Sequence, residues 1–128
     1  NLLLGMGSFW EGADFAQQDK VIEIITRLPF DNPKDPFYQK IESLFSKQGK
    51  STFDSYSLPM MVLRFKQAIG RAQRRPEQRS AILLMDNRPL VKSYGKLFIK
   101  EVSQEVTLRH APFKQIKEDI QEFLEKEC

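Results

Sequence analysis

The sequence has few of the residue types that metal centres and hydrolytic relays need. Its one cysteine, Cys128, stands at the C-terminal end, which excludes an internal disulfide and a cysteine-rich zinc or iron–sulfur site within this chain. Its one histidine, His110, sits in an apolar-flanked stretch, so a histidine-based metal site or a serine–histidine relay is not expected. We expect no metal ligands in this chain.

Long apolar runs are also missing. No stretch approaches the roughly 20 residues that a membrane-spanning helix needs, and no signal-peptide layout is present. We therefore expect a cytoplasmic protein with no membrane partner. The chain opens on Asn1-Leu2-Leu3-Leu4-Gly5, without an initiator methionine or a polar lead-in, which favours a piece of a longer protein.

The composition is that of one folded domain. A chain of 128 residues can build one hydrophobic core, and 41% hydrophobic with 29% charged residues is typical of a globular domain. The net charge of +3 permits polyanion binding without demanding it. Positive charge gathers between Arg64 and Arg79, where Glu77 is the only acid, whereas residues 118–127 are mostly acidic.

Apolar runs alternate with amphipathic segments along the chain. The expected strands are Leu2–Leu4, Lys20–Leu28, Ser80–Met85 and, more weakly, Val106–Arg109; the expected helices are Pro36–Lys47, Leu58–Arg75, Val91–Val102 and Pro112–Lys126. This alternation indicates an α/β fold with a mainly parallel sheet covered by helices on both faces. Ligands of such sheets bind at the carboxyl ends of the strands. The loops after Leu4, Leu28 and Met85 are the candidates.

Start and stop signals frame two of the expected helices. Pro36 stands at the start of one, and Gly49 follows its end. Ser57 is a candidate cap for the long helix, with Pro59 in its first turn and Pro76 as its stop.

The long helix carries a stripe of cationic and amide side chains. At about 100° per residue, Arg64, Gln67, Arg71 and Arg74 fall opposite an apolar face. That apolar face consists of Leu58, Met61, Val62, Phe65, Ile69 and Ala72. Arginine suits phosphate binding because its planar fork offers fixed donors and stays charged, although any amphipathic helix also has a solvated charged face. Gly70 favours the functional interpretation, because a mid-helix glycine costs about 1 kcal/mol relative to alanine, and we expect a close approach to its backbone.

A glycine-rich loop follows the first expected strand. It reads Gly7-Ser8-Phe9-Trp10-Glu11-Gly12-Ala13-Asp14-Phe15, and backbone N–H groups of such a loop can hold phosphate. Phe9 and Trp10 can stack on bases, or they can pack into the core or against a neighbouring domain. The chain has no Gly-x-x-x-x-Gly-Lys-Ser/Thr loop, so we do not expect it to hydrolyse nucleotide alone.

The order of three motifs resembles one family. The loop from Ser8 to Asp14, the Gln-x-x-Gly-Arg-x-x-Arg stretch from Gln67 to Arg74, and the strand end Met85-Asp86-Asn87-Arg88 are similar to the second motor domain of DinG-type superfamily 2 helicases, relatives of the XPD-like repair helicases. The resemblance extends from Leu2 to about Leu124 and includes the Leu28-Pro29-Phe30 connector. It implies that residues 1–128 form a single RecA-like C-terminal motor domain.

The resemblance also implies roles for individual residues. Arg71 and Arg74 would act as arginine fingers on ATP, which the other motor domain would bind together with Mg²⁺. The further implied roles are Gln67 and Gly70 near the phosphates, Gly12 and Asp14 near the ribose or between nucleotide and DNA, and Ser8, Phe9, Trp10 and Arg64 on DNA. Two departures from the family pattern are Gln73 in place of an aliphatic residue and Arg79-Ser80 in place of Asp-x-Gly.

Three functions stay open, and the first is preferred. The chain is the C-terminal motor domain of an ATP-dependent DNA helicase or translocase, with single-stranded or forked DNA and the N-terminal motor domain of the same chain as partners. Alternatively, it is a nucleic-acid-binding module that uses the Arg64–Arg79 segment, or a regulatory domain of a DinG-like 3'-5' exonuclease. In the preferred case the isolated chain is inactive.

Overall fold

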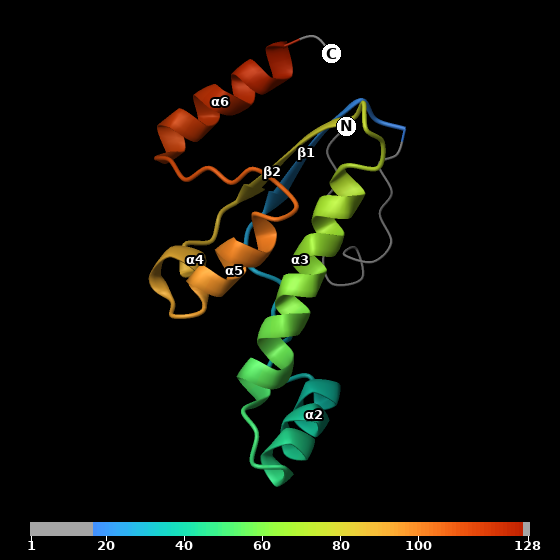
Figure 1. The fold of residues 1–128 in the computed structure, drawn as a ribbon, viewed down its shortest axis with the longest axis vertical. Coiled ribbons are helices and arrows are strands. Elements are labelled where there is room, and N and C mark those ends of the chain that lie inside the picture. The colour runs from blue at the N-terminus through green and yellow to red at the C-terminus, as the bar shows by residue number, and fades with distance from the viewer. Residues whose placement is uncertain (1–16, 127–128) are drawn as a thin grey trace.

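The computed structural model describes residues 17–126 and contains a parallel strand pair with helices beside it, while the first and the last helix lie at opposite ends of the molecule (Figure 1). The elements in order are β1 (Lys20–Ile25), α2 (Pro36–Lys47), the π-helical segment η1 (Phe53–Ser57), α3 (Leu58–Ala72), β2 (Arg79–Leu84), α4 (Arg88–Val91), α5 (Gly95–Val102) and α6 (Phe113–Glu125). The expected strand Leu2–Leu4 and the glycine-rich loop as far as Asp14 lie outside the described residues.

β1 and β2 run parallel, in a register that sets Lys20 opposite Arg79 and Ile25 opposite Leu84. Ile25 belongs to the hydrophobic core, and Leu84 packs against that core from the neighbouring strand. On the other face of the pair, Ile24 keeps 58% of its surface exposed. The α/β class and the parallel pairing are confirmed, whereas a wider RecA-like sheet with helices on both faces stays a prediction.

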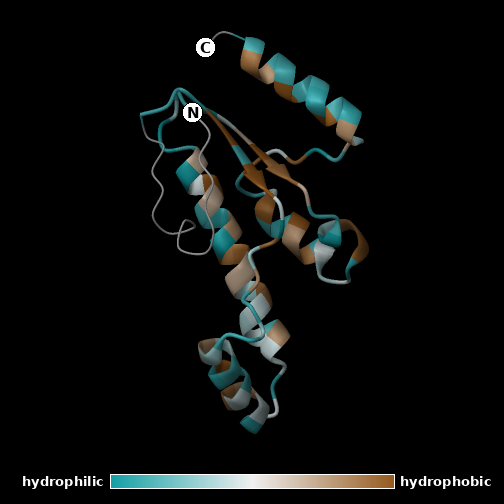
Figure 2. Ribbon diagram, turned by 180° about the vertical axis from the view of Figure 1, so that it is seen from behind, coloured by the Kyte–Doolittle hydropathy of each residue, from teal (hydrophilic) through white to brown (hydrophobic). Residues whose placement is uncertain are grey.

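The core lies where α3 crosses the strands and α5 packs beside it. Figure 2 colours both strands and much of α5 as hydrophobic. Phe65 of α3 meets Phe98 of α5 edge to face, with ring centroids 5.0 Å apart. Ala68 and Ala72 of α3 have no exposed surface, and such small side chains let a helix approach its neighbours closely. The long helix is therefore fixed against the sheet along its C-terminal half.

α2 has the predicted bounds because both of its caps are local. The side chain of Asp35 accepts two backbone N–H groups of the first turn at 2.8 and 3.2 Å, and Pro36 occupies the first helical position. At the other end Gly49 adopts a φ of 66°, the left-handed region that glycine favours, and its N–H bonds to the Ser46 carbonyl at 3.0 Å.

The predicted cap of the long helix is wrong. Ser57 has the helical backbone angles φ −62° and ψ −47° and makes no side-chain cap bond. A cap residue needs a non-helical backbone, but η1 runs directly into α3 and leaves Ser57 in the interior of a continuous helical segment. Its Oγ instead pairs with the Tyr38 hydroxyl at 2.9 Å, which joins α2 to the start of α3.

The long helix ends at Ala72, short of the predicted Arg75. Gln73 leaves the helix with an extended backbone, φ −127° and ψ 90°. The side chain of Gln78 accepts the backbone N–H of Arg74 at 2.7 Å, so a side-chain bond replaces the next helical one. Arg74 therefore lies in the turn after α3 and not on the helix.

Two other expectations also differ. The helix expected at Val91–Val102 begins only at Gly95, as α5, while Val91 ends the short α4; Gly95 packs directly on the backbone of Pro89. The strand expected at Val106–Arg109 is irregular and pairs with neither β1 nor β2. α6 lies within the predicted Pro112–Lys126.

Candidate functional site

The cationic and amide stripe of α3 does not share one solvent-facing side. Gln67 and Gly70 are exposed, Arg64 is half-buried, and Arg71 keeps only 7% exposure. The buried face of α3 is wider than the apolar pattern indicates because it includes Ala68, and at about 100° per residue Arg64 and Arg71 lie at its edge. The prediction of a single polar face is therefore wrong.

Arg64 is bound to the connector that follows β1. One guanidinium nitrogen lies 2.8 Å from Oδ1 of Asp31, and another donates to the Pro29 carbonyl at 3.2 Å. The side chains of this ion pair are 23% and 21% exposed. DNA would have to compete with these contacts, so the role of Arg64 on DNA stays a prediction.

Arg71 belongs to the buried residues of α3. Glu23 shares the inward face of β1 with Ile25, since the two stand two residues apart on the strand. Burial raises the pKa of the Glu23 carboxyl, and the positive charge of Arg71 works in the opposite direction.

The turn after α3 borders a hollow of about 440 Å³. Its lining is Lys66, Ile69, Gly70, Gln73, Arg74, Arg75, Pro76 and Glu105. Among the described residues no atom lies within 4 Å of the position that a Cβ on Gly70 would take. The close approach expected from this glycine is therefore not made by this part of the chain, because Gly70 stands on the solvent side of α3.

The same turn is fastened to the segment that precedes β1. Arg75 lies 3.0 Å from a carboxylate oxygen of Asp19, and the buried Gln78 donates to the Gln18 carbonyl at 2.8 Å. These contacts hold the turn that carries Arg74. No sequence motif indicates these roles of Arg75 and Gln78, and a glutamine in a polar turn carries no signal that it will be buried.

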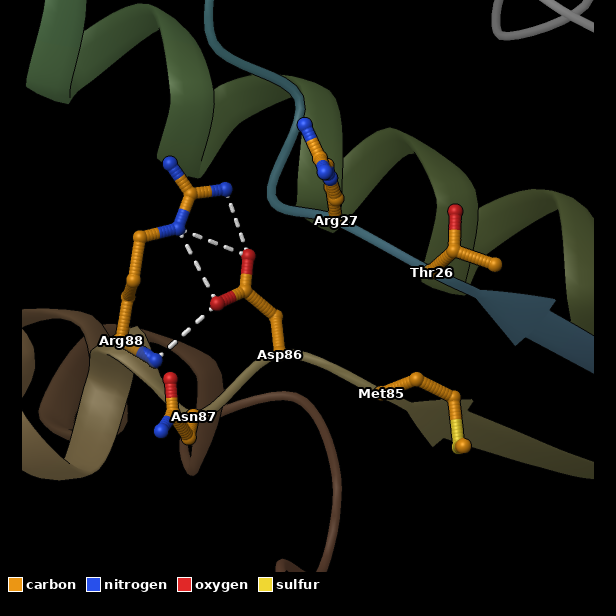
Figure 3. Close-up of a pocket in the computed structure, with 6 residues that line it drawn as sticks. All are labelled: Thr26, Arg27, Met85, Asp86, Asn87 and Arg88. Atoms are coloured by element: carbon orange, nitrogen blue, oxygen red, sulfur yellow. Dashed lines mark hydrogen bonds and ion pairs between the residues drawn. The ribbon is translucent and has the colours of Figure 1, made fainter.

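The carboxyl ends of β1 and β2 meet at a second hollow, of about 630 Å³ (Figure 3). Its lining is Thr26, Arg27, Met85, Asp86, Asn87 and Arg88. The connector after Leu28 and the loop after Met85, two of the predicted ligand loops, come together here through a hydrogen bond from the Leu28 N–H to Asp86 at 2.8 Å.

Asp86 organises this edge of the sheet. Arg88 donates from Nε to both of its carboxylate oxygens, at 3.0 and 2.9 Å, and its own backbone N–H bonds there at 3.0 Å. Burial of Asp86 raises its pKa, but the bonds from Arg88 and Leu28 outweigh that effect and bring the pKa down to about 2. The Arg88 guanidinium also lies over the ring of Phe30, 5.4 Å from its centroid. Asp86 and Arg88 appeared in a predicted motif but without a structural role.

Several predicted site residues lie outside the described residues, namely Ser8, Phe9, Trp10, Gly12 and Asp14. Within residues 17–126 there is no group of three or more His, Cys, Asp or Glu side chains that could hold a metal ion. No helix in the same part of the chain is long and apolar enough to cross a membrane.

The chain belongs to the helicase C-terminal domain family, which its residues 1–105 match. It is 40% identical over 98 residues to the 3'-5' exonuclease DinG of Bacillus subtilis (strain 168), a match that covers 77% of this chain and 10% of that protein. It is 35% identical over 98 residues to the ATP-dependent DNA helicase YoaA of Escherichia coli (strain K12), covering 77% of this chain and 15% of that protein.

A third relative covers more of the chain. The 3'-5' exonuclease DinG of Staphylococcus aureus (strain NCTC 8325 / PS 47) is 36% identical over 122 residues, 95% of this chain and 12% of that protein. The chain thus spans only 10 to 15% of the length of these relatives. No solved structure matches it. The resemblance to DinG-type helicases is confirmed.

Proposed function

We propose that this chain is the C-terminal motor domain of an ATP-dependent DNA helicase or translocase of the DinG type. Membership of the helicase C-terminal domain family supports the class. The observation that carries the proposal is the cationic end of α3, where Arg74 and Arg75 line an open hollow and Arg71 lies at the last turn of the helix. Residues 1–128 would form one RecA-like domain of a longer chain, next to an N-terminal motor domain.

In this proposal Arg71 and Arg74 reach the phosphates of ATP across the cleft between the motor domains. Negative charge develops on the transferred phosphoryl group, and an arginine supplied by a second domain can raise the rate by ~10³–10⁵. Three cationic side chains, Lys66, Arg74 and Arg75, line the hollow with one carboxylate, Glu105. Lys66 pairs with Glu101 at 3.2 Å and Arg75 with Asp19 at 3.0 Å, so an anion bound there would compete with these ion pairs. The N-terminal motor domain would hold most of the ATP together with its Mg²⁺. Hydrolysis would then depend on closure of the two domains.

The exposed turn of α3 that carries Gln67 and Gly70 would face the same cleft. Since nothing described in this chain fills the space beside Gly70, the close approach would come from the nucleotide or from the other motor domain. The remaining proposed contacts, carried over from the resemblance, are Gly12 and Asp14 at the nucleotide and Ser8, Phe9, Trp10 and Arg64 on single-stranded or forked DNA.

The test uses the full-length protein that contains this domain. Arg71→Ala and Arg74→Ala should each lower DNA-stimulated ATP turnover by about a thousandfold or more while DNA affinity stays within about twofold. Arg109→Ala is the matched control, because this exposed arginine pairs with Asp119 at 2.9 Å, away from α3. ATP turnover that survives both the Arg71 and the Arg74 substitution would contradict the proposal.

The second candidate is a nucleic-acid-binding or regulatory module of a 3'-5' exonuclease. The Bacillus and Staphylococcus relatives, which are named 3'-5' exonuclease DinG, favour it. In that case the Arg64–Arg79 segment would bind the DNA backbone, and log K would fall with log salt in proportion to the phosphates contacted. Arg71→Ala would then weaken DNA binding modestly and reduce the salt slope by about one contact. In the helicase proposal the same substitution leaves DNA binding nearly intact.

A further inference from the structure

The hollow at the carboxyl ends of β1 and β2, here called the strand-end hollow, has no part in the proposed ATP reaction. The turn that carries Arg74 lies at the start of the strands, where Arg75 and Gln78 bind the segment before β1. Six residues of parallel strand, about 20 Å, separate that start from the end of β2. The strand-end hollow, with Asp86 and Arg88 in its lining, is therefore a second polar site, remote from the proposed phosphate contacts.

The strand-end hollow has an excess of positive charge. Two arginines, Arg27 and Arg88, line it together with one carboxylate, Asp86, whose charge Arg88 already offsets. Arg27 is exposed and has no hydrogen-bond or ion-pair partner in the part of the chain that the structure describes. Figure 3 shows its side chain beside the Asp86–Arg88 pair but not joined to it. An exposed guanidinium of this kind suits a phosphate, because its donors stay charged and lie in a fixed plane.

Three aromatic rings continue this surface beyond the hollow. Phe30 follows β1, Phe53 belongs to η1, and Tyr94 lies between α4 and α5; their ring centroids are 5.4 to 5.8 Å apart. Phe30 also lies under the Arg88 guanidinium, so the rings adjoin the strand-end hollow. Phe53 keeps 40% of its surface exposed although two other rings contact it. An exposed ring that its neighbours hold in place is a platform on which another planar group can stack.

The charges that flank the rings favour an anionic partner over an apolar one. Lys92 and Lys96 stand two residues before and two residues after Tyr94, and both are exposed, with no ion-pair partner within residues 17–126. The acid that follows Phe53 in the sequence is Asp54. An apolar peptide does not need a cationic border. Cations beside an exposed aromatic ring are the combination that binds single-stranded nucleic acid.

We infer that the surface from the strand-end hollow to Phe53 binds single-stranded DNA, with a base stacked on the Phe53 ring and a backbone phosphate at Arg27. This inference rests on the proposed function, which makes DNA the partner of the domain. Stacking requires an unpaired base with a free face, so duplex DNA can use the cations but not the ring. The surface adds to the DNA contacts proposed for Arg64 and the first loop.

The test measures the affinity of the full-length protein, without nucleotide, for a fluorescent oligo(dT) of about 20 nucleotides and for a duplex of the same length. Phe53→Leu keeps an apolar side chain but removes the ring. We expect it to bind oligo(dT) about five- to thirtyfold more weakly, while duplex affinity stays within about twofold. Phe37→Leu is the matched control, because Phe37 is 67% exposed on α2, and it should bind both DNAs as the wild type does.

Arg27→Gln tests the phosphate contact separately. We expect binding of both DNAs to weaken about three- to tenfold, and the slope of log K against log salt for oligo(dT) to become shallower by about 0.7. Arg109→Gln is the control, because this exposed arginine pairs with Asp119, and it should leave the slope unchanged. Since the described chain makes no polar contact with the Arg27 side chain, its substitution should leave the fold intact.

Wild-type affinity of folded Phe53→Leu for oligo(dT) would overturn the inference, and so would an equal loss on oligo(dT) and duplex. A wild-type salt slope in Arg27→Gln would overturn the phosphate contact, and this result decides alone should Phe53→Leu fail to fold. The proposed function has its own readout, because it fails if Arg71→Ala leaves ATP turnover intact. If Arg71→Ala abolishes turnover while Phe53→Leu and Arg27→Gln bind oligo(dT) as the wild type does, only this inference fails.

Discussion

Asp86 accepts the backbone N–H of Leu28 at 2.8 Å and so joins the carboxyl ends of the neighbouring strands β1 and β2. The same carboxylate holds the side chain of Arg88, whose guanidinium lies over Phe30 in the connector after β1. One residue therefore fastens the loop after β2, the connector and the start of α4. Arg64 of α3 donates a hydrogen bond to the Pro29 carbonyl in the same connector, so the connector joins this edge of the sheet to the long helix.

We expect Asp86→Asn to lower the free energy of unfolding by about 2–3 kcal/mol. Asparagine keeps an acceptor for the Leu28 N–H but removes the charge that Arg88 pairs with, in a side chain only 6% exposed. Urea unfolding of the chain measures the change. Asp54→Asn is the control, because Asp54 is exposed, and its effect should stay within about 0.5 kcal/mol. Equal effects of the two substitutions would rule out the role given to Asp86.

The pKa of Asp86, lowered to about 2, predicts how stability depends on pH. Because the folded state favours the ionised carboxyl, its contribution is fully present above the ordinary aspartate pKa and is lost as the pH falls from about 4 to 2. The shift corresponds to about 2 kcal/mol. The unfolding free energies of the wild type and Asp86→Asn should therefore converge between pH 5 and 2. A difference that stays constant across this range would contradict the assignment.

Local signals explain which parts of the fold the sequence predicts. The bounds of α2 follow from Asp35 and Gly49, and both caps act within a few residues of the helix ends. The end of α3 follows from a contact with distant sequence, because Gln78 binds both the Arg74 N–H and the Gln18 carbonyl, 60 residues away. Helical periodicity contains no information about that bond.

The sequence likewise predicts only part of the candidate site. Hydrophobic runs correctly placed the loops after Leu28 and Met85 at one edge of the sheet, but not the Asp86 bond that joins segments 58 residues apart. The helical wheel left Ala68 out of the apolar face. Because Ala68 is fully buried, the edge of that face moves round to Arg71. The burial of Arg71 thus depends on tertiary packing, which the helical periodicity of the sequence does not predict.

Gly95→Ala and Gly70→Ala should change stability in opposite directions. A Cβ on Gly95 would lie 1.8 Å from the Pro89 carbonyl oxygen, which is backbone, so α4 and α5 would have to separate at a cost of about 1–3 kcal/mol. A Cβ on Gly70 meets no described atom within 4 Å, and alanine there should stabilise the helix by up to about 1 kcal/mol. Thermal unfolding should rank Gly70→Ala above the wild type and Gly95→Ala below it. A stabilising Gly95→Ala would show that the corner between α4 and α5 is not packed as described.

Gly70→Ala should lower activity although it stabilises the fold. If the nucleotide or the other motor domain approaches α3 at its exposed turn, a methyl group on Gly70 takes up the space that they need. We expect the full-length variant to lose about tenfold or more in kcat/KM for ATP hydrolysis while its unfolding midpoint rises. Ser43→Ala, an exposed substitution in the interior of α2, should raise helix stability without a kinetic effect. Wild-type kinetics in Gly70→Ala would mean that nothing approaches this turn of α3 during turnover. That result would contradict the proposal that the hollow beside Arg74 binds the phosphates.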